Sequence, residues 1–320
     1  MKGLPLVVAC LAFAPLFAVG QAFPLKPVRL LVPSTPGGSV DTVARTVGGR
    51  LSERWGQQLV IDNRTGAGGG IAASIVAKSP PDGYTLILGT VAAFAINVGM
   101  KKSLPYDPAR DFSPITLMAT QDLMLIVHPS IPARSVKELV ALAKRQPGHY
   151  SYASAGNGTG GHLSGELFKS LAGIELLHVP YKGVAPLLVD LAAGEVSMTF
   201  ASLLAGSAYV SSGKVRALAV TGARRSPSAP ELPTMAEAGV PGYESSTWYG
   251  ILAPARTPAA IIARLNQDVL TVLREPDVHD RLAKQGVFTV GTTPDAFRAH
   301  ITREIRKWGE VMKAAGIVPQ

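Results

Sequence analysis

A short apolar strand followed by a glycine-rich turn and the start of a helix recurs three times in this chain. The turns lie at residues 35–38, 65–70 and 154–161. After each turn, apolar side chains recur at helical spacing, as expected for an amphipathic helix. Strands that alternate with such helices predict βαβ units and mainly parallel sheets. We therefore expect an α/β fold in which central sheets are flanked by helices.

The three turns also indicate a binding chemistry. The first N–H groups of a helix have no partner within the helix, and its start carries a partial positive charge. Glycine lets backbone amides approach a ligand closely, so three helix starts facing one cleft would suit a doubly ended anion such as a dicarboxylate. The alternative is that each turn only connects a strand to a helix, where glycine is common. A single turn favours that alternative, whereas three in one chain favour an anion site.

One turn also fits a dinucleotide-binding fingerprint. Gly156, Gly158 and Gly161 match G-x-G-x-x-G between a strand and a helix. This fingerprint also expects an acidic residue about 20 positions later, at the end of the next strand. Glu175 does not fit that place, because it precedes the apolar part of the strand. A dinucleotide-binding protein therefore remains only an alternative.

Enzymatic or metal chemistry finds little support in the side chains. The six histidines are dispersed, and neither His-Glu-x-x-His nor Gly-x-Ser-x-Gly occurs. His162, in the first turn of a helix, could donate to a bound carboxylate or could simply cap and pack. Asp41 could touch a ligand, but an acid in a first helical turn is favourable for the helix dipole alone. We expect no catalytic residue, metal or cofactor; an exported enzyme using the glycine-rich cleft is the alternative.

The N-terminus predicts export. Lys2 precedes an uncharged apolar run, and Gly20-Gln21-Ala22 offers small residues for cleavage before Phe23. Residues 1–22 are therefore interpreted as a signal peptide, and the remainder as a soluble periplasmic protein. The single cysteine, Cys10, lies inside the leader. A lipid anchor at Cys10 is the less favoured alternative, because too little apolar sequence precedes it.

The charge of the chain favours anionic solutes over nucleic acid. The formal net charge is +9, but the basic residues are scattered and no aromatic-interleaved basic stripe appears. This charge indicates a mild attraction for anions.

Near the C-terminus, Thr257-Pro258 and Thr293-Pro294 predict two helices with threonine at the N-cap and proline at the first helical position. Gly316 is expected to end the last helix.

These sequence blocks, taken in order, resemble the Bug-type extracytoplasmic solute-binding proteins of tripartite tricarboxylate transporters. The resemblance covers essentially the whole chain after the leader. Its blocks are PVRLLVP at 27–33, PGG at 36–38, NRTGAGG at 63–69, PDGYTL at 81–86, LPYD at 104–107, YASAGNG at 152–158, VPYKG at 179–183, WYG at 248–250 and APA at 253–255. Each block is modest support, whereas their order and spacing together are specific.

The resemblance implies a fold of the periplasmic-binding-protein type, a Venus flytrap of two lobes. Residues 23–122 and 245–320 would form lobe 1, and residues 123–244 would form lobe 2. A small mono- or dicarboxylic acid would be captured between the lobes and delivered to the membrane permease subunits of the transporter. We expect a monomer that binds no nucleic acid.

The resemblance also implies which residues contact the ligand. From lobe 1 they would be Thr35, Gly37, Gly38 and Thr90, and from lobe 2 they would be Ser154, Asn157, Gly158, Thr159 and His162. The Ser154 hydroxyl is expected to donate a hydrogen bond to a ligand carboxylate. Weaker candidates are Ser34, Asp41, Tyr181 and Ala201.

Two positions depart from the family pattern. Ser34 stands where the family usually has an aromatic residue, so a wall of the ligand site would be missing. Ala201 stands where the family usually has aspartate, which removes a carboxylate that could pair with a cationic or hydroxyl group. Amino acids are therefore less expected as ligands than plain organic acids.

Overall fold

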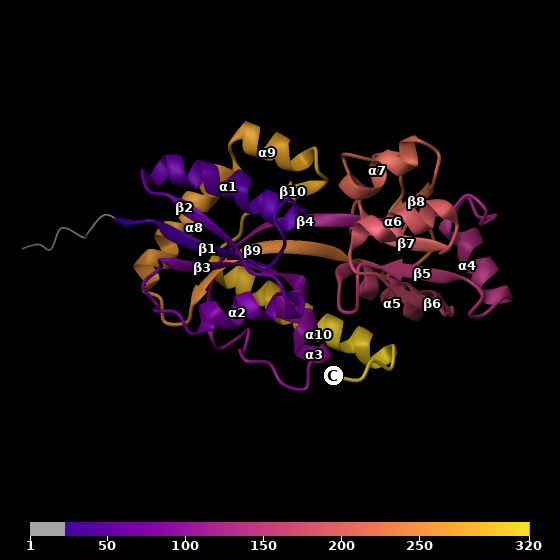
Figure 1. Cartoon of the computed structure of the whole chain (residues 1–320), viewed down its shortest axis with the longest axis horizontal. Helices are drawn as coiled ribbons and strands as arrows, with labels where there is room; N and C mark the ends of the chain where they lie inside the picture. The colour runs from indigo at the N-terminus through magenta and orange to yellow at the C-terminus, as the bar shows by residue number, and fades with distance from the viewer. Residues whose placement is uncertain (1–22, 320) are drawn as a thin grey trace, which may run out of the picture.

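The computed structural model describes residues 23–319 as an α/β fold with one continuous ten-stranded sheet. The main strand order is β2-β1-β3-β9-β4-β7-β5-β6, with β10 and β8 pairing on β4. Figure 1 shows the elements gathered into two groups that β4 and β9 connect. The predicted leader, with Cys10, lies outside the described residues. Within residues 23–319, no helix is long and apolar enough to cross a membrane.

The first group contains the N-terminal strands and the C-terminal helices. Its parallel strands β1 (Val28–Val32), β2 (Leu59–Asn63) and β3 (Thr85–Thr90) continue into β9 (Ser246–Pro254), which runs antiparallel to β3. The strand β10 (Val287–Thr289) pairs with β4. The helices of this group are α1 (Ser39–Trp55), η1 (Ala67–Gly69), α2 (Gly70–Ala77), the π-helix η2 (Ala92–Ile96), α3 (Asn97–Met100), α8 (Ala259–Leu273), α9 (Pro276–Ala283) and α10 (Pro294–Ala314).

The second group has a parallel set of its own. The strands β5 (Ser151–Ser154), β6 (Leu177–Pro180) and β7 (Met198–Ser202) are parallel, and β8 (Arg216–Val220) pairs antiparallel with β4. The helices are α4 (Val136–Arg145), α5 (Gly160–Ala172), α6 (Val184–Ala193) and α7 (Leu203–Ser211). The expected α/β fold with helix-flanked sheets is confirmed.

The strand β4 (Phe112–Val127) is shared by the two groups and changes partners along its length. It pairs with β9 as far as the register Asp122↔Ser246 and with β7 from Leu123↔Ser202 onward. Fourteen of its sixteen residues are buried, and ten of these are apolar core residues, so β4 lies in the core of both groups.

The two C-terminal helix starts give one confirmed and one wrong prediction. Thr293 is the N-cap of α10, and its side chain accepts a hydrogen bond from Ala296 N, with proline at the first helical position. Thr257 is not an N-cap: α8 begins at Ala259, after Pro258. The Thr257 hydroxyl instead donates to the Pro254 carbonyl at 2.8 Å, because the chain is still turning out of β9 there. The last helix ends at Ala314, and Gly316 follows with φ +66°.

Candidate functional site

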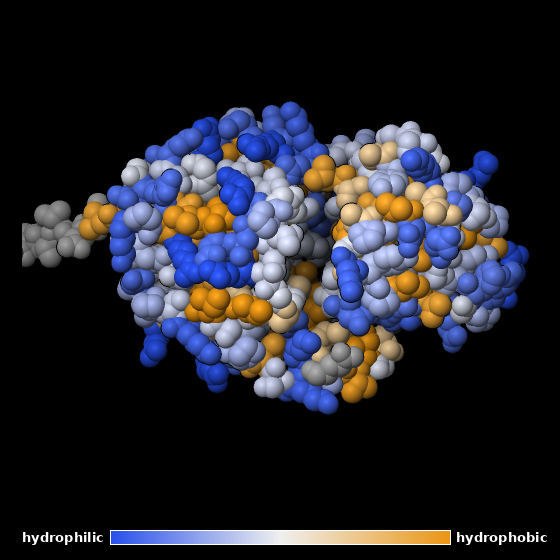
Figure 2. All heavy atoms as spheres, viewed as in Figure 1, coloured by the Kyte–Doolittle hydropathy of each residue, from blue (hydrophilic) through white to orange (hydrophobic). Residues whose placement is uncertain are grey.

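A cleft of about 240 Å³ lies where the two groups meet. Figure 2 shows the surface hollowed between them. Its lining comes from the starts of α1 and α5, from α6, and from β4, β7 and β9. The lining residues are Ser39, Val40, Gln121, Leu123, Ala155, Thr159, Gly160, Gly161, Val184, Leu187, Thr199, Phe200, Ala201, Ser202, Thr247 and Tyr249.

The lining of this cleft carries no charged side chain. Its one titratable group is the Tyr249 phenol, whose pKa is raised by burial, so it stays neutral. The Tyr249 hydroxyl donates to Gln121 Oε1 at 2.6 Å. Attraction for an anion in this cleft therefore has to come from backbone amides, hydroxyls and helix dipoles.

Two helix starts enter the cleft. The α1 helix begins at Ser39 after Gly38, which makes no side-chain cap, so its first amides have no side-chain partner. The α5 helix begins at Gly160 after Thr159, whose side chain accepts from His162 N. The third glycine-rich turn does not join them: residues 65–70 are absent from the lining, and Ala67 O accepts from the Asn97 side chain instead. Two helix starts therefore line this cleft, and the part of the third turn in the site stays a prediction.

The loop before α1 is held by Asp41. Its Oδ2 accepts from the Gly37 amide and from Arg45 Nε, both at 2.9 Å, and its Oδ1 accepts from Asn63 Nδ2 at 2.9 Å. Gly37 has φ +84°, a backbone conformation that favours glycine. Asp41 is 2% exposed and lines no part of the cleft. Its position fits a residue that shapes the loop.

The electrostatics of Asp41 agree with that position. Burial alone would raise the pKa of this carboxyl, but the hydrogen bonds from Arg45, Gly37 and Asn63 outweigh burial and hold the pKa below its usual range. Asp41 is therefore ionised at neutral pH.

The neighbouring loop residues bond among themselves. The Ser34 hydroxyl donates to the Thr35 carbonyl, and Ser34 O accepts from Asn63 Nδ2 at 3.0 Å. Thr35 and Gly37 are exposed, next to the start of α1.

The loop before α5 is also organised from within. Ser154 is 1% exposed; its Oγ accepts from the Gly156 amide at 3.2 Å and lies 2.7 Å from His178 Nε2. The Thr159 hydroxyl donates to the Gly156 carbonyl at 2.7 Å. Gly158 has φ +75°, and its amide donates to His162 Nδ1 at 3.1 Å. These contacts fix a tight turn in front of the first amides of α5.

Of the residues predicted for the site, Thr159 and Ala201 line the cleft. Ser34, Thr35, Gly37 and Gly38 form the turn before α1, and Ser154, Asn157, Gly158 and His162 lie in or beside the turn before α5. Thr90 is buried, and its hydroxyl accepts from Ala93 N at 3.4 Å. Tyr181 donates to Asp190 Oδ2 at 2.8 Å, and burial and this contact raise the pKa of its phenol to about 12. Direct ligand contacts by these residues stay predictions.

Several lining residues were not singled out from the sequence. Gln121 lies on β4 and Thr247 on β9, where the register pairs them. Val184 and Leu187, on α6, supply part of an apolar wall. The only local signal was the WYG block beside Thr247, since the pairing of β4 with β9 is not visible in a single stretch of sequence.

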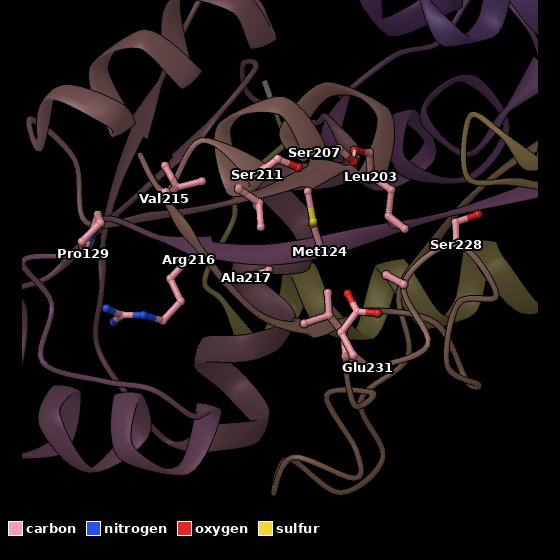
Figure 3. Close-up of a pocket in the computed structure, with 14 residues that line it drawn as sticks. Met124, Pro129, Leu203, Ser207, Ser211, Val215, Arg216, Ala217, Ser228 and Glu231 are labelled. Atoms are coloured by element: carbon pink, nitrogen blue, oxygen red, sulfur yellow. Dashed lines mark hydrogen bonds between the residues drawn. The ribbon is translucent and has the colours of Figure 1, made fainter.

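A larger cavity of about 680 Å³ lies within the second group, between α7, β8 and residues 228–232. Figure 3 shows Arg216 and Glu231 at its edge and Met124 at its base. The Arg216 guanidinium donates to the Ala133 carbonyl at 2.8 Å. None of the predicted site residues lines this cavity. Among residues 23–319, no cluster of three or more His, Cys, Asp or Glu side chains could hold a metal ion.

Comparison with solved structures supports the fold. The structure titled R. palustris Rpa4515 with adipate is 44% identical, has a TM-score of 0.84, and is matched over 93% of this chain and 100% of that chain. MatC from Rhodopseudomonas palustris with bound malate is 32% identical with a TM-score of 0.79, over 90% of this chain and 99% of that chain.

Comparison of sequences identifies the family. BugT of Bordetella pertussis is 36% identical over 297 residues, which are 92% of this chain and 91% of that protein. The family model described as the tripartite tricarboxylate transporter family receptor matches residues 43–317. With its α/β fold and a cleft that two helix starts enter, the chain belongs to the tripartite tricarboxylate transporter receptor family.

Proposed function

We propose that this protein captures a small mono- or dicarboxylic acid in the cleft and delivers it to the membrane permease subunits of a tripartite tricarboxylate transporter. One observation carries the proposal: the starts of α1 and α5 enter the same cleft, whose lining has no charged side chain. Carboxylates suit this arrangement because unpaired amides and the positive end of each helix dipole favour negative charge. An amine would find no carboxylate partner in the lining.

The shape of the lining supports an acid with an apolar body. Val40, Leu123, Val184 and Leu187 are apolar, while Thr247 offers a hydroxyl. A ligand with one carboxylate at each helix start and a short hydrocarbon spacer would satisfy both kinds of surface. The adipate in one relative's title and the malate in another's are acids of this class. Adipate is our first choice as a probe.

Ligand capture would require the two groups to move. We take residues 23–122 with 245–320 as lobe 1 and residues 123–244 as lobe 2. The change of β4 partners between Asp122 and Leu123 supports this division. Closure of the lobes around the acid would bring the two helix starts onto its ends. Further ligand contacts would come from Thr35, Gly37, Gly38, Asn157 and Gly158.

The remaining parts of the proposal concern location and class. Residues 1–22 would be removed as a signal peptide, leaving a monomer in the periplasm. The protein would bind its solute without changing it, as a receptor and not as an enzyme. The family description supports this class.

Two measurements test the proposal. Mass spectrometry of small molecules released from protein purified from its host should find an organic acid. Thermal unfolding with a panel of organic acids should show stabilisation by at least one, about 2.7 kcal/mol at 100 times its dissociation constant. Chromatography of the same mixtures should recover the acid unchanged. Stabilisation by sugars, amino acids or NAD in place of organic acids would overturn the proposal, and so would turnover of the bound acid.

A further inference from the structure

Two histidine rings lie against each other behind the loop that precedes α5. The rings of His162, on α5, and His178, on β6, are stacked with centroids 4.2 Å apart and planes 25° apart. Tyr152, on β5, also stacks on His178, with centroids 4.8 Å apart. His162 is 6% exposed. Neither ring is among the residues that line the cleft.

Each ring is tied to the loop by a hydrogen bond. The Gly158 amide donates to His162 Nδ1 at 3.1 Å. Because an amide can only donate, Nδ1 must carry a lone pair, and the ring is uncharged with its proton on Nε2. His178 Nε2 lies 2.7 Å from Ser154 Oγ, which also accepts from the Gly156 amide. The pair therefore holds both ends of the turn whose last residues, Thr159, Gly160 and Gly161, line the cleft.

The surroundings of the rings disfavour a charged pair. Burial lowers the pKa of His162 below its usual value, and burial together with the neighbouring His162 ring lowers the pKa of His178 to about 4. The other titratable groups that face the rings are Tyr152, Glu166 and Lys169. Glu166 raises both pKa values and Lys169 lowers them. Glu166 is itself engaged, since it accepts from the Tyr152 hydroxyl at 2.5 Å and from Lys169 Nζ at 2.9 Å.

This inference rests on the proposed function: we infer that His162 and His178 are positioning residues for the turn before α5, and that the turn keeps its binding conformation only while the His162 ring is uncharged. A proton on His162 Nδ1 would face the Gly158 N–H, so two donors would oppose each other and the hydrogen bond would be lost. The turn would then leave the conformation that presents the first amides of α5 to the cleft. Ligand binding would weaken in acid.

The sign of this pH effect separates it from simple electrostatics. An imidazolium near the cleft would attract an anionic ligand and tighten binding in acid. Release of the turn would instead weaken ligand binding in acid, because only the fraction of protein with neutral His162 can bind. At one pH unit below the pKa of His162, that fraction falls to about one tenth, and the apparent dissociation constant rises about tenfold.

The first test is calorimetric titration with adipate from about pH 7.5 to about pH 4, a range extended below that of an ordinary histidine because burial lowers the pKa of His162. His162→Asn puts an amide oxygen, which accepts but does not titrate, near the place of Nδ1. Between the two pH values, the affinity for adipate should fall by a larger factor in the wild type than in His162→Asn, whatever the absolute affinity of the variant. Protonation of adipate itself affects both proteins equally. His279→Asn, which alters an exposed histidine paired only with Asp280, is the control and should behave as wild type.

The second test needs no ligand. In nuclear magnetic resonance spectra of glycine- and histidine-labelled protein, the Gly158 amide shift should titrate together with the His162 ring in the wild type. In His162→Asn it should stay constant. An unchanged Gly158 shift while His162 titrates would overturn the inference, as would equal pH dependence of wild type and His162→Asn or tighter wild-type binding in acid. If no organic acid binds at any pH, the proposed function fails, while the spectra still decide whether the ring holds the turn.

Discussion

The carboxylate of Asp41, in the first turn of α1, accepts a hydrogen bond from the amide of Gly37 at 2.9 Å. The helix therefore holds the turn that leads into it. The same carboxylate joins this turn to β2 through Asn63. On the other side of the cleft, His162 does the same for Gly158. In both lobes of the proposed flytrap, a first-turn side chain shapes the loop in front of its own helix.

Asp41→Asn should destabilise the protein and weaken ligand binding. The amide would place N–H donors against Gly37 N–H or Arg45, and losing hydrogen bonds to a charged group costs about 1–3 kcal/mol. Urea denaturation measures this loss. Asp295→Asn is the matched control, since Asp295 is an exposed acid in the first turn of α10. Equal, small effects of both substitutions would show that Asp41 serves only the helix dipole.

The pH dependence of Asp41 provides a second test of the same contacts. Because the folded-state pKa is lowered, the stabilisation is fully present above the usual aspartate pKa and is lost as pH falls through the lowered value. Wild type and Asp41→Asn should therefore differ most in unfolding free energy at neutral pH, and the difference should shrink as the pH falls below the usual aspartate pKa. A stability difference that does not change with pH would mean that ionisation of Asp41 contributes nothing.

Gly161→Ala should disturb the cleft at the start of α5. A Cβ there would lie 2.9 Å from the Phe200 carbonyl oxygen, so α5 and β7 would have to separate. We expect a loss of about 1–3 kcal/mol and weaker binding of the acid. Gly49→Ala, in the α1 helix with nothing within 4 Å of the added carbon, is the control. It should be neutral or stabilise the protein by about 0.5–1 kcal/mol. Unfolding midpoints that rank the two variants the other way would contradict this account of the close approach.

Ser154→Ala tests whether its hydroxyl serves the ligand or the turn. The hydroxyl is buried and bonded to Gly156 and near His178, so its removal should cost about 1–3 kcal/mol of stability and should also weaken binding. The sequence alone favoured a direct ligand contact, with binding weakened and stability nearly unchanged. Calorimetry and denaturation of one variant separate these outcomes: lost affinity with unaltered stability would restore the direct contact.

Ala201→Asp should impair binding of organic acids. The substitution places a carboxylate in a cleft that has no charged lining, and repulsion between like charges there should weaken adipate binding about tenfold or more. Ala208→Asp, at an exposed position of α7, controls for the added net charge. Unaltered affinity in Ala201→Asp would place the acid away from β7.

The strand–turn–helix units could be predicted because their signals are local. The turns at 35–38 and 154–161 each lead into a helix within a few residues of the expected start. The long strands β4 and β9 gave no comparable signal, because both faces of β4 are buried and its apolar residues do not alternate. The register that brings Gln121 beside Thr247 depends on residues more than a hundred positions apart.

The candidate site was predictable only in outline for the same reason. The sequence marked Asp41, Ser154 and His162 as polar residues near glycine turns, and the structure places all three beside those turns. It could not show that their partners would be Asn63, His178 and Gly158. Those contacts form across strands and turns, so they depend on the folded sheet and leave no pattern in the chain.

The most direct test of the account compares adipate with adipamide, its uncharged diamide of the same length, by calorimetric titration of residues 23–320. If helix starts and amides in the cleft recognise carboxylates, adipate or a close homologous diacid should bind saturably at one site per chain. The diamide should bind at least about 100-fold more weakly, a difference of about 2.8 kcal/mol. Equal affinity for acid and diamide, or binding of the diamide alone, would contradict the central claim.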